Sequence, residues 1–447
     1  MYDMDAGEGL TREWSDGDMV WQSPIAPGIS WYQATLPERP TYPALDGSTT
    51  ADVAVIGGGF TGLQAACQLA EDGVDVVLID AARFGDGASG RNGGQLGTGQ
   101  HWWPEELETK LGAERSQAFF RIAEEAKSHL LDFARKHKVN IDFKPGQLSV
   151  AHKRGMEYTY RRHVETLAER YDYPHLSFMS KAETAERLGS DRFFCGIRDI
   201  GTGHIHPLKL LVGIAGAAAA AGARLHEMTK AENIDHVDGK NVIETARGSI
   251  TAERVLIACN GYIEDHLEPK TASKIMPIRS FIAATTPVKK DRKILPGGES
   301  VDDSRFVVRY FRKAPTGEML FGGREVYSAD NPKNISRHLR RQIAEIYPQL
   351  KDVEITHAWG GSVGITMPRR PLVHDIMPGV TSIGGFSGHG VMLSNYCGKL
   401  YADEIAGRSL DLELYRDLDI PSFPGGGPLR KPLLFLALTW FALRDRF

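Results

Sequence analysis

Three glycines at positions 57, 59 and 62 follow an apolar run and precede a helix-like stretch, an arrangement that can bind phosphate. The stretch DVAVIGGGFTGLQAACQLAEDGVDVVLID, residues 52–80, predicts a strand, a glycine turn, a helix and a second strand. The first glycine permits the tight turn, the second lets a pyrophosphate approach the backbone, and the third lets helix and strand pack. The second strand ends at Asp80, 23 residues after Gly57, where a carboxylate can accept hydrogen bonds from a ribose. The sequence therefore predicts a dinucleotide site made by Gly57, Gly59, Phe60, Thr61, Gly62, Asp80 and Ala81.

A second glycine-rich stretch, GDGASGRNGGQLGTG at residues 85–99, has seven glycines in fifteen positions. Glycine costs conformational entropy to order, so this density indicates that something comes very close to the backbone. A nicotinamide coenzyme needs no such loop after the ribose acid, whereas the flat ring of a flavin lies against backbone. A flexible surface loop is the alternative, which Trp102 and Trp103 disfavour because they are suited to wall a cavity. The residues expected at the flavin are Ala88, Ser89, Arg91, Asn92, Gly93, Gly94 and Gln95.

A third stretch, GGFSGHGVMLSN at residues 384–395, follows a predicted strand and opens a predicted helix. The N–H groups at the start of that helix can face the polar edge of a flavin and stabilise negative charge on the reduced ring. His389 either lines the site or fills the turn. The residues expected here are Gly388, His389, Gly390 and Val391, joined by Gly261 from the glycine turn after the strand-like RVLIACNGY.

Together these stretches resemble the D-amino-acid oxidase superfamily of FAD-dependent amine and amino-acid oxidoreductases, over about residues 30–407. SWYQAT, IGGGFTGLQAA, GASGRNGGQ, GTGHIHPLKL and WGGSVGITMPRRP are most similar to its γ-glutamylputrescine oxidase branch. The resemblance implies an α/β fold: a doubly wound FAD-binding domain of the Rossmann-like, glutathione-reductase type, interleaved with an α+β substrate domain on a mostly antiparallel sheet. It also implies hydride transfer from the α-carbon of an amine to flavin N5, hydrolysis of the imine, and no side chain acting as a strong base.

The expected division follows this interleaved pattern. Residues 1–50 form an N-terminal extension, pinned by Trp21, Trp31 and Tyr32. Residues 51–145, 196–270 and 356–447 form the FAD-binding domain, and residues 146–195 and 271–355 form the substrate domain.

The chain departs from this family at two positions. Sarcosine-oxidase-like members carry a lysine just past the GFSGHG turn that holds the substrate carboxylate, and this chain has Met392. A carboxylate buried without a cation would cost several kcal/mol, so the change favours a longer amine, such as an acylated or free polyamine. Those members also carry a lysine above the flavin associated with oxygen activation, where EMLFGG offers Leu320. The acceptor is therefore oxygen or an electron carrier, and the protein is an oxidase, a dehydrogenase or a flavin-binding protein without turnover.

Other residues keep two interpretations. Arg279 either faces the substrate cavity or points elsewhere. Arg369 and Arg370 either contact an acidic tail of the substrate or are solvated surface charges. His204 and His206 are a metal pair or, as we expect, structural. The substrate-lining residues are predicted to be Trp102, Trp103, Arg279, Leu320, His389 and Met392. No catalytic residue and no metal site is predicted, and no cysteine or histidine is clearly placed for a covalent flavin bond, so we expect non-covalent FAD.

Composition narrows the class of protein. A net charge of −4 gives no case for nucleic acid, whose binders carry a basic face. The cysteines, Cys67, Cys195, Cys259 and Cys397, are too far apart to indicate a metal pair or a disulfide framework. The N-terminus has no apolar run, and no stretch reaches the roughly 18 apolar residues of a membrane span, which predicts a cytoplasmic protein. The apolar stretch Leu433–Leu443, flanked by basic residues, is expected to be a helix docked on the protein or a membrane-surface or partner contact.

Overall fold

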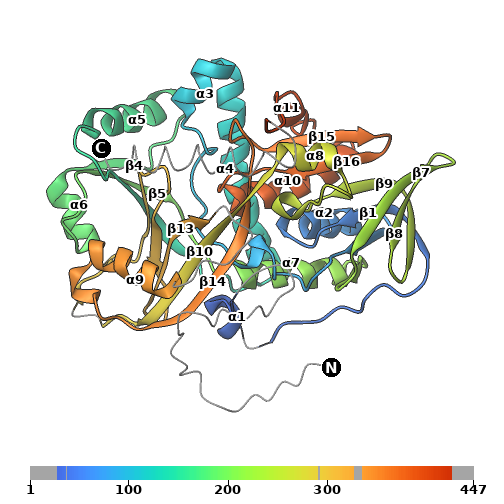
Figure 1. The fold of residues 1–447 in the computed structure, drawn as a ribbon. Coiled ribbons are helices and arrows are strands. Elements are labelled where there is room, and N and C mark those ends of the chain that lie inside the picture. Colours follow the sequence, from blue (N-terminus) through green and yellow to red (C-terminus); the bar gives the residue numbers. More distant parts are fainter. Residues whose placement is uncertain (1–27, 37, 290–291, 327–334, 425–447) are drawn as a thin grey trace, which may run out of the picture.

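The computed structural model describes residues 28–36, 38–289, 292–326 and 335–424 of the 447-residue chain. Within these residues, two eight-stranded sheets lie side by side, each with its own helices (Figure 1). This arrangement confirms the predicted α/β fold with two interleaved units.

The first sheet has the strand order β15-β16-β9-β1-β2-β6, and its central strands are parallel. Its strands are β1 (Thr49–Ile56), β2 (Val76–Ile79), β6 (Arg224–His226), β9 (Gly248–Ile257), β15 (Leu372–Met377) and β16 (Val380–Gly384), with the hairpin β7 (Ala231–Val237) and β8 (Lys240–Thr245) joined to β9. The residues Val76–Ile79 are all buried, as expected for a parallel strand covered on both faces.

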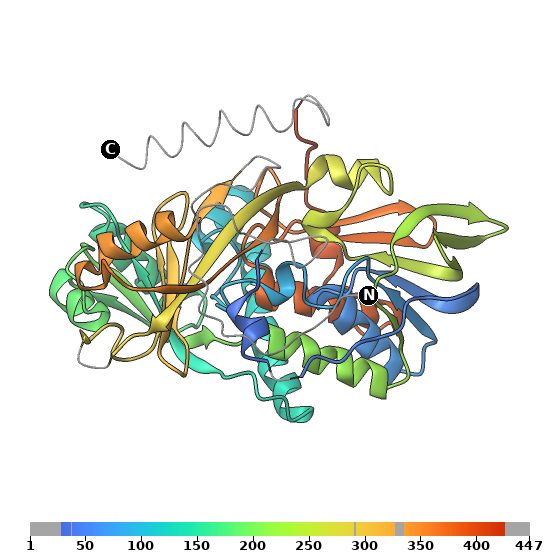
Figure 2. The ribbon, with the colours of Figure 1, turned by 60° about the horizontal axis from the view of Figure 1, so that its bottom comes forward.

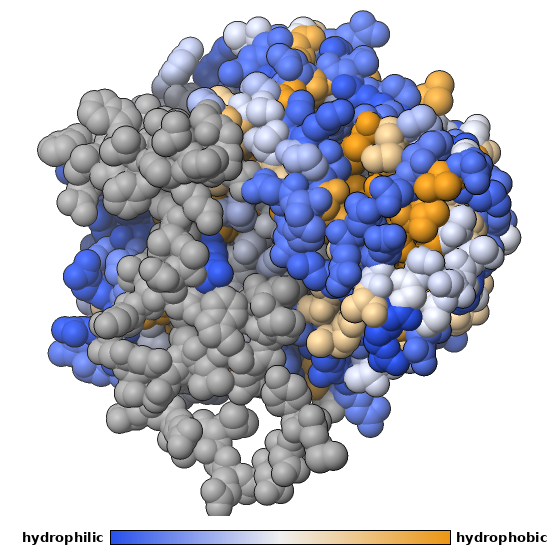
Figure 3. All heavy atoms as spheres, turned by 45° about the vertical axis from the view of Figure 1, so that its right-hand side comes forward, coloured by the Kyte–Doolittle hydropathy of each residue, from blue (hydrophilic) through white to orange (hydrophobic). Residues whose placement is uncertain are grey.

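Helices cover one face of this sheet, and the β7–β8 hairpin contributes to the core on the other. Val53, Val55 and Leu78 belong to the cluster of the helices α2 (Phe60–Glu71), α7 (Pro207–Ala220) and α10 (Gly390–Ile405), whereas Ala54, Ile56 and Val77 pack with the hairpin. The surface at this end of the molecule is mainly hydrophilic, with its hydrophobic residues in small groups (Figure 3).

The second sheet has the order β14-β10-β13-β12-β11-β3-β5-β4, and only the β11–β3 pair is parallel. Its strands are β3 (Lys144–Val150), β4 (Leu176–Met179), β5 (Gly196–His204), β10 (Met276–Pro287), β11 (Ser300–Asp303), β12 (Tyr310–Lys313), β13 (Glu318–Val326) and β14 (Ile355–Ile365). Phe281, Phe311 and Phe321 pack beneath α9 (Ile335–Ile346) on one face. On the other face, Leu320 and Trp359 join the same cluster as α2 and α10, so one core connects the two sheets.

Two predicted boundaries fall inside the second sheet. Residues 196–270 and 356–447 were assigned to the FAD-binding domain, but β5 pairs with β3 and β4, and β14 pairs with β10. β5 lies at the start of segment 196–270 and β14 at the start of segment 356–447, and the later strands of both segments do belong to the first sheet. The sequence of a strand does not reveal which strand it pairs with. We therefore propose that residues 196–204 and 356–365 go with the substrate unit.

The remaining helices differ little from expectation. Residues 104–136 form two helices, because Gly112, with a φ of +84°, separates α3 (Pro104–Leu111) from α4 (Ala113–Lys136). The others are α1 (Trp31–Ala34), α5 (Glu157–Arg170), α6 (Lys181–Leu188), α8 (Pro269–Lys274) and α11 (Glu413–Arg416). Trp31 and Tyr32 are buried, whereas Trp21 and Leu433–Leu443 lie outside the described residues. That Trp21, Trp31 and Tyr32 pin the N-terminal extension stays a prediction. No helix in the described part of the chain is long and apolar enough to cross a membrane.

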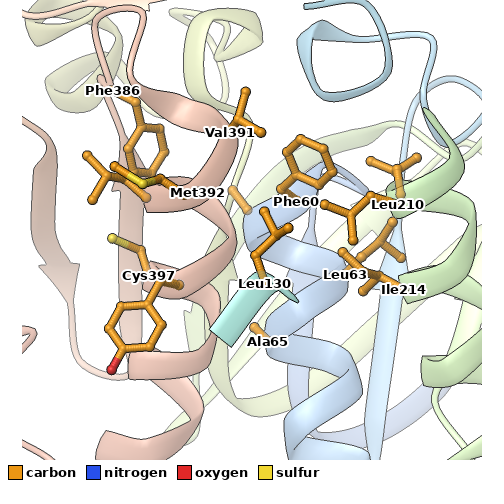
Figure 4. Packing of buried hydrophobic residues seen from close by; sticks show 14 of the residues in the cluster. Phe60, Leu63, Ala65, Leu130, Leu210, Ile214, Phe386, Val391, Met392 and Cys397 are labelled. Carbon is orange, nitrogen blue, oxygen red and sulfur yellow. The ribbon is translucent and has the colours of Figure 1, made fainter. Parts of the chain in front are cut away.

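Helices α2 and α10 approach closely because one of them lacks a side chain at the crossing. A Cβ on Gly398 would lie 2.2 Å from the carbonyl oxygen of Thr61. Beside it, the buried amide of Asn395 donates to Gln64 Oε1 at 3.1 Å. Figures 2 and 4 show the two helices adjacent, with Phe60, Leu63 and Met392 among the side chains packed in this core. This contact joins the turn at residues 57–62 to the turn at residues 385–389.

Replacing Gly398 with alanine should lower the free energy of unfolding by about 1–3 kcal/mol, because the backbone oxygen it meets cannot rotate away. Gly216 of α7 is a matched control, since it is exposed and a Cβ there meets nothing within 4 Å. Gly216→Ala should leave stability unchanged or raise it by about 0.5–1 kcal/mol. Thermal unfolding of both variants measures the difference, and equal midpoints would contradict the crossing described here.

Candidate functional site

The first glycine turn holds β1 and α2 at a separation that no side chain would permit. Gly57 has φ +112°, and a Cβ there would lie 2.8 Å from the carbonyl oxygen of Ala258 on the next strand. A Cβ on Gly62 would lie 1.9 Å from Gly57 O. Gly59 stands just before the helix, where a Cβ would come within 2.9 Å of Ser89 Oγ. The turn therefore leaves main chain, rather than side chains, at the start of α2.

Asp80 ends β2 beside this turn. Its Oδ2 accepts from the N–H of Gly58 at 2.6 Å, and its Oδ1 accepts from the N–H of Ala82 at 2.8 Å. Burial raises the pKa of this carboxyl to about 6, against which the two hydrogen bonds act. The group is therefore ionised at neutral pH and fixed where a ribose would meet it, with Ala81 exposed next to it.

The second glycine stretch is tied to the first turn at its beginning. Ser89 Oγ accepts from the N–H of Phe60 at 3.0 Å, in the first turn of α2. The side chain of Asn92 donates to the carbonyls of Ala88 and Ser89 and accepts from the N–H of Gly94. Residues 88–94 are thus folded on their own backbone and held against the helix N-terminus.

The end of the same stretch pairs with the second sheet. Gln95 forms a bridge with His204 of β5, the N–H of Leu96 donates to Gly203 O at 2.9 Å, and Thr202 Oγ1 donates to Gly97 O at 2.7 Å. A Cβ on Gly94 would lie 2.2 Å from Ile205 O. The loop therefore spans from the helix of one sheet to the edge of the other, which accounts for its glycine content.

Buried cations hold the loop in place. Arg91 is 4% exposed, and it donates to Gly360 O at 2.7 Å and to Gly28 O at 2.6 Å, while its own carbonyl accepts from Trp359 Nε1. Burial lowers the pKa of Arg91 to about 10, so it is still charged at neutral pH. Its guanidinium serves the protein backbone, and contact of its main chain with a flavin stays a prediction.

Two further cations, Arg312 and Lys127, contact the loop after Arg91. Arg312 of β12 donates to Gly93 O at 2.8 Å and to Ile205 O at 2.9 Å. Lys127 of α4 donates to Thr98 Oγ1 at 2.9 Å and forms an ion pair with Glu124. Sequence reasoning missed both cations, because nothing in the sequence relates them to the loop.

One face of the second sheet lies over the loop. Tyr310 of β12 would be 2.9 Å from a Cβ on Gly93, and its hydroxyl lies 3.3 Å from Ser280 Oγ of β10. Gly361 of β14 pairs with Ser280, and a Cβ on it would lie 3.9 Å from Ala88 Cα. Because side chains alternate along β10, Arg279 is on the opposite face, with Phe281 and α9. The structure therefore separates Arg279 from this face and adds Tyr310 and Ser280, which sequence reasoning missed.

The third glycine turn meets the other two. Asn260 Oδ1 accepts from the N–H of Gly385 at 2.8 Å, which places Gly261 beside this turn. Gly388 has φ +96° and no atom within 4 Å of a Cβ position. His389 precedes α10, and its ring lies 3.5 Å from a Cβ on Gly97. Gly390 and Val391 begin the helix itself.

The other predicted substrate-lining residues have different surroundings. Leu320 and Met392 are 2% and 0% exposed and belong to the main hydrophobic cluster, Met392 close to Phe386 (Figure 4). Trp102 Nε1 donates to Pro368 O at 2.7 Å. Trp103 stacks on His163 of α5, with ring centroids 3.9 Å apart. The roles of Leu320, Met392 and Trp102 stay predictions.

The cysteines and the pair His204–His206 have side chains of the types that bind metals. The four thiols are free, and burial raises the pKa of Cys67, Cys259 and Cys397 to about 12. His204 Nε2 lies 3.0 Å from Gly298 O, and His206 Nδ1 accepts from the N–H of Lys209. The described residues contain no group of three or more His, Cys, Asp or Glu side chains that could hold a metal.

A large open depression of about 980 Å³ lies elsewhere, between α4, residues 169–173, His175 and α10. None of the predicted site residues lines it.

Residues 52–404 match the family model of FAD dependent oxidoreductases, and the chain belongs to this family. It is 65% identical to the probable oxidoreductase OrdL of Rhizobium meliloti, over 96% of this chain and 100% of that protein. It is 32% identical to the γ-glutamylputrescine oxidoreductase of Escherichia coli, over 93% of this chain and 98% of that protein. Among solved structures, L-proline dehydrogenase from P. horikoshii has a TM-score of 0.69 at 22% identity, covering 82% of this chain and 96% of that chain, which shows the shared fold.

These comparisons confirm the predicted resemblance and FAD as the cofactor of the chain. The residues present fit FAD, because Gly59 and Gly62 leave the start of α2 free of side chains and Asp80 is ionised beside it. Contacts with the protein account for several glycines of the second stretch, among them Gly90, Gly93 and Gly94, and a flavin ring against this loop stays a prediction.

Replacing Gly59 with valine should give colourless protein, since the added side chain occupies the position of the pyrophosphate and meets Ser89. The visible absorbance of flavin per protein measures occupancy, and circular dichroism of the apoproteins checks that both variants fold. Gly216→Val, an exposed helical glycine far along the chain, should keep the yellow colour. Full flavin occupancy in Gly59→Val would refute this placement of the dinucleotide.

Proposed function

We propose that this FAD-dependent oxidoreductase oxidises an amine, and that γ-glutamylputrescine or a related acylated or free polyamine is its substrate. Support comes from the 32% identity to a γ-glutamylputrescine oxidoreductase over nearly the full length of both chains. The observation that carries the proposal is Met392, which is fully buried at the start of α10. An apolar side chain there offers no cation to a carboxylate beside the reacting nitrogen.

Bound FAD supplies the acceptor for a hydride from the carbon next to the nitrogen, and water hydrolyses the resulting imine to an aldehyde. The residues of the chain then bind, orient and exclude solvent. Tyr310 and Ser280 present hydroxyls on the sheet face over the loop, where they can hold the amine. Burial lowers the pKa of His389 to about 4, so its imidazole is neutral at neutral pH and does not repel a cationic amine.

A dehydrogenase that passes electrons to a carrier is the second candidate. Leu320 supports it, because an apolar, 2% exposed side chain takes the place of the lysine that the family associates with oxygen. A cytoplasmic location, and any membrane-surface or partner contact through Leu433–Leu443, stay expectations.

Anaerobic mixing with a panel of amines tests these alternatives. Bleaching of the flavin by γ-glutamylputrescine, or by another polyamine, is the expected result, and rapid return of colour in air identifies an oxidase. Bleaching followed by slow return of colour identifies a dehydrogenase. A flavin that no amine bleaches would contradict the proposal and leave a binding protein or another substrate class.

Denaturation of the yellow protein with acid should release all of its flavin into the supernatant. The reason is that the thiols of Cys67, Cys259 and Cys397 are neutral at neutral pH, whereas the thiolate is the nucleophilic form of cysteine. Absorbance that stays with the precipitate would show a covalent bond and contradict the expected non-covalent FAD.

A further inference from the structure

Arg369, His101 and His389 form a cluster beside the third glycine turn. The rings of His101 and His389 meet edge to face, with centroids 5.4 Å apart at 88°. Arg369 Nη1 lies 3.5 Å from His101 Nε2, and its guanidinium lies 4.6 Å from the centroid of Phe306. Arg369 is partly exposed, so a ligand can reach it.

The charge of this cluster favours an anion. A guanidinium only donates, so His101 Nε2 accepts from Arg369 and the proton of the neutral ring is on Nδ1. That Nδ1 is buried and has no hydrogen-bond partner among the residues that the structure describes. Burial, His389 and Arg369 all lower the pKa of His101, so the ring is neutral at neutral pH and the positive charge is that of Arg369.

The turn that carries Arg369 is held rigidly against the GFSGHG turn. Arg369 has φ +53°, its N–H donates to Thr366 O at 3.0 Å, and the N–H of Thr366 donates to Ser387 Oγ at 3.3 Å. Trp102 donates to the carbonyl of Pro368 in the same turn. A guanidinium positioned in this way loses little entropy when it binds a carboxylate.

A chain of contacts connects Arg369 to the glycine-rich loop. His389 is adjacent to Gly97 of the glycine-rich loop, His101 lies beyond His389, and Arg369 beyond His101. A carboxylate at Arg369 therefore belongs to the far end of a long substrate, not to the carbon that is oxidised.

We propose that Arg369, whose guanidinium contacts His101, binds the carboxylate of an amine substrate at the end remote from its reacting nitrogen, and thereby selects acylated diamines that carry a carboxylate. A guanidinium has five N–H donors in one plane, so it can contact His101 and a carboxylate together. This inference rests on the proposed amine oxidation.

Steady-state kinetics with two substrates test the site. γ-Glutamylputrescine carries the remote carboxylate, and N-acetylputrescine has the same reacting amine and amide without it. Arg369→Gln should lower kcat/KM for γ-glutamylputrescine by about 10- to 100-fold, mainly through KM, as expected for lost hydrogen bonds to a charged group. The same variant should change kcat/KM for N-acetylputrescine less than about twofold.

Arg370→Gln is the matched control. The charged neighbour of Arg370 is Arg115, toward α11, so the two adjacent arginines point to different surroundings. This control should alter neither substrate. Equal losses on both substrates in Arg369→Gln, or no loss, would overturn the inference while the proposed function stands.

Calorimetric titration with glutarate, a dicarboxylate without an amine, separates the two proposals. Binding to the wild-type holoenzyme that is lost in Arg369→Gln and kept in Arg370→Gln supports the anion site, even if neither amine is oxidised. Absence of glutarate binding to the wild type, or equal binding to Arg369→Gln, would overturn it.

Discussion

The close approach of main chain to main chain around residues 88–97 is the constraint on which the rest of the structure depends. At its start, this segment accepts the first N–H of α2 through Ser89, and at its end it pairs with β5 through Gln95 and Leu96. A Cβ at Gly94 would meet a backbone oxygen, so the pairing exists only with glycine there. The loop thus sets the separation of the two sheets and, with it, the space between the glycine turns and the sheet face that carries Tyr310.

The buried positive charges around the loop support its structure. Arg91, Arg312 and Lys127 are all buried, and each donates to carbonyls or hydroxyls around the loop. A buried cation without such partners would be costly. The cations and the loop groups that accept from them therefore stabilise each other. Arg369 differs from them, since it is partly exposed and contacts an imidazole and an aromatic ring.

The sequence was most informative where the backbone itself is the functional group. The strand, turn and helix at residues 49–71, the acid at Asp80 and the three glycine stretches were predictable, because glycine spacing and buried apolar runs are local signals. The direction in which individual side chains point was not predictable. Trp103 turns to α5 and Arg279 lies on the α9 face, since both depend on pairing and packing with distant residues. For the same reason Tyr310 was missed, and β5 and β14 were assigned to the wrong sheet.

The strand order also has a consequence for biosynthesis. β1 lies between β2 and β9, and β9 in turn pairs with β16, while α10 packs against α2. The dinucleotide turn, made early in translation, therefore waits for residues 380–405 before its helix and sheet are covered. Until then the nascent polypeptide exposes apolar β1 and α2 surface, which makes this period the one in which chaperones and rapid completion of synthesis matter most.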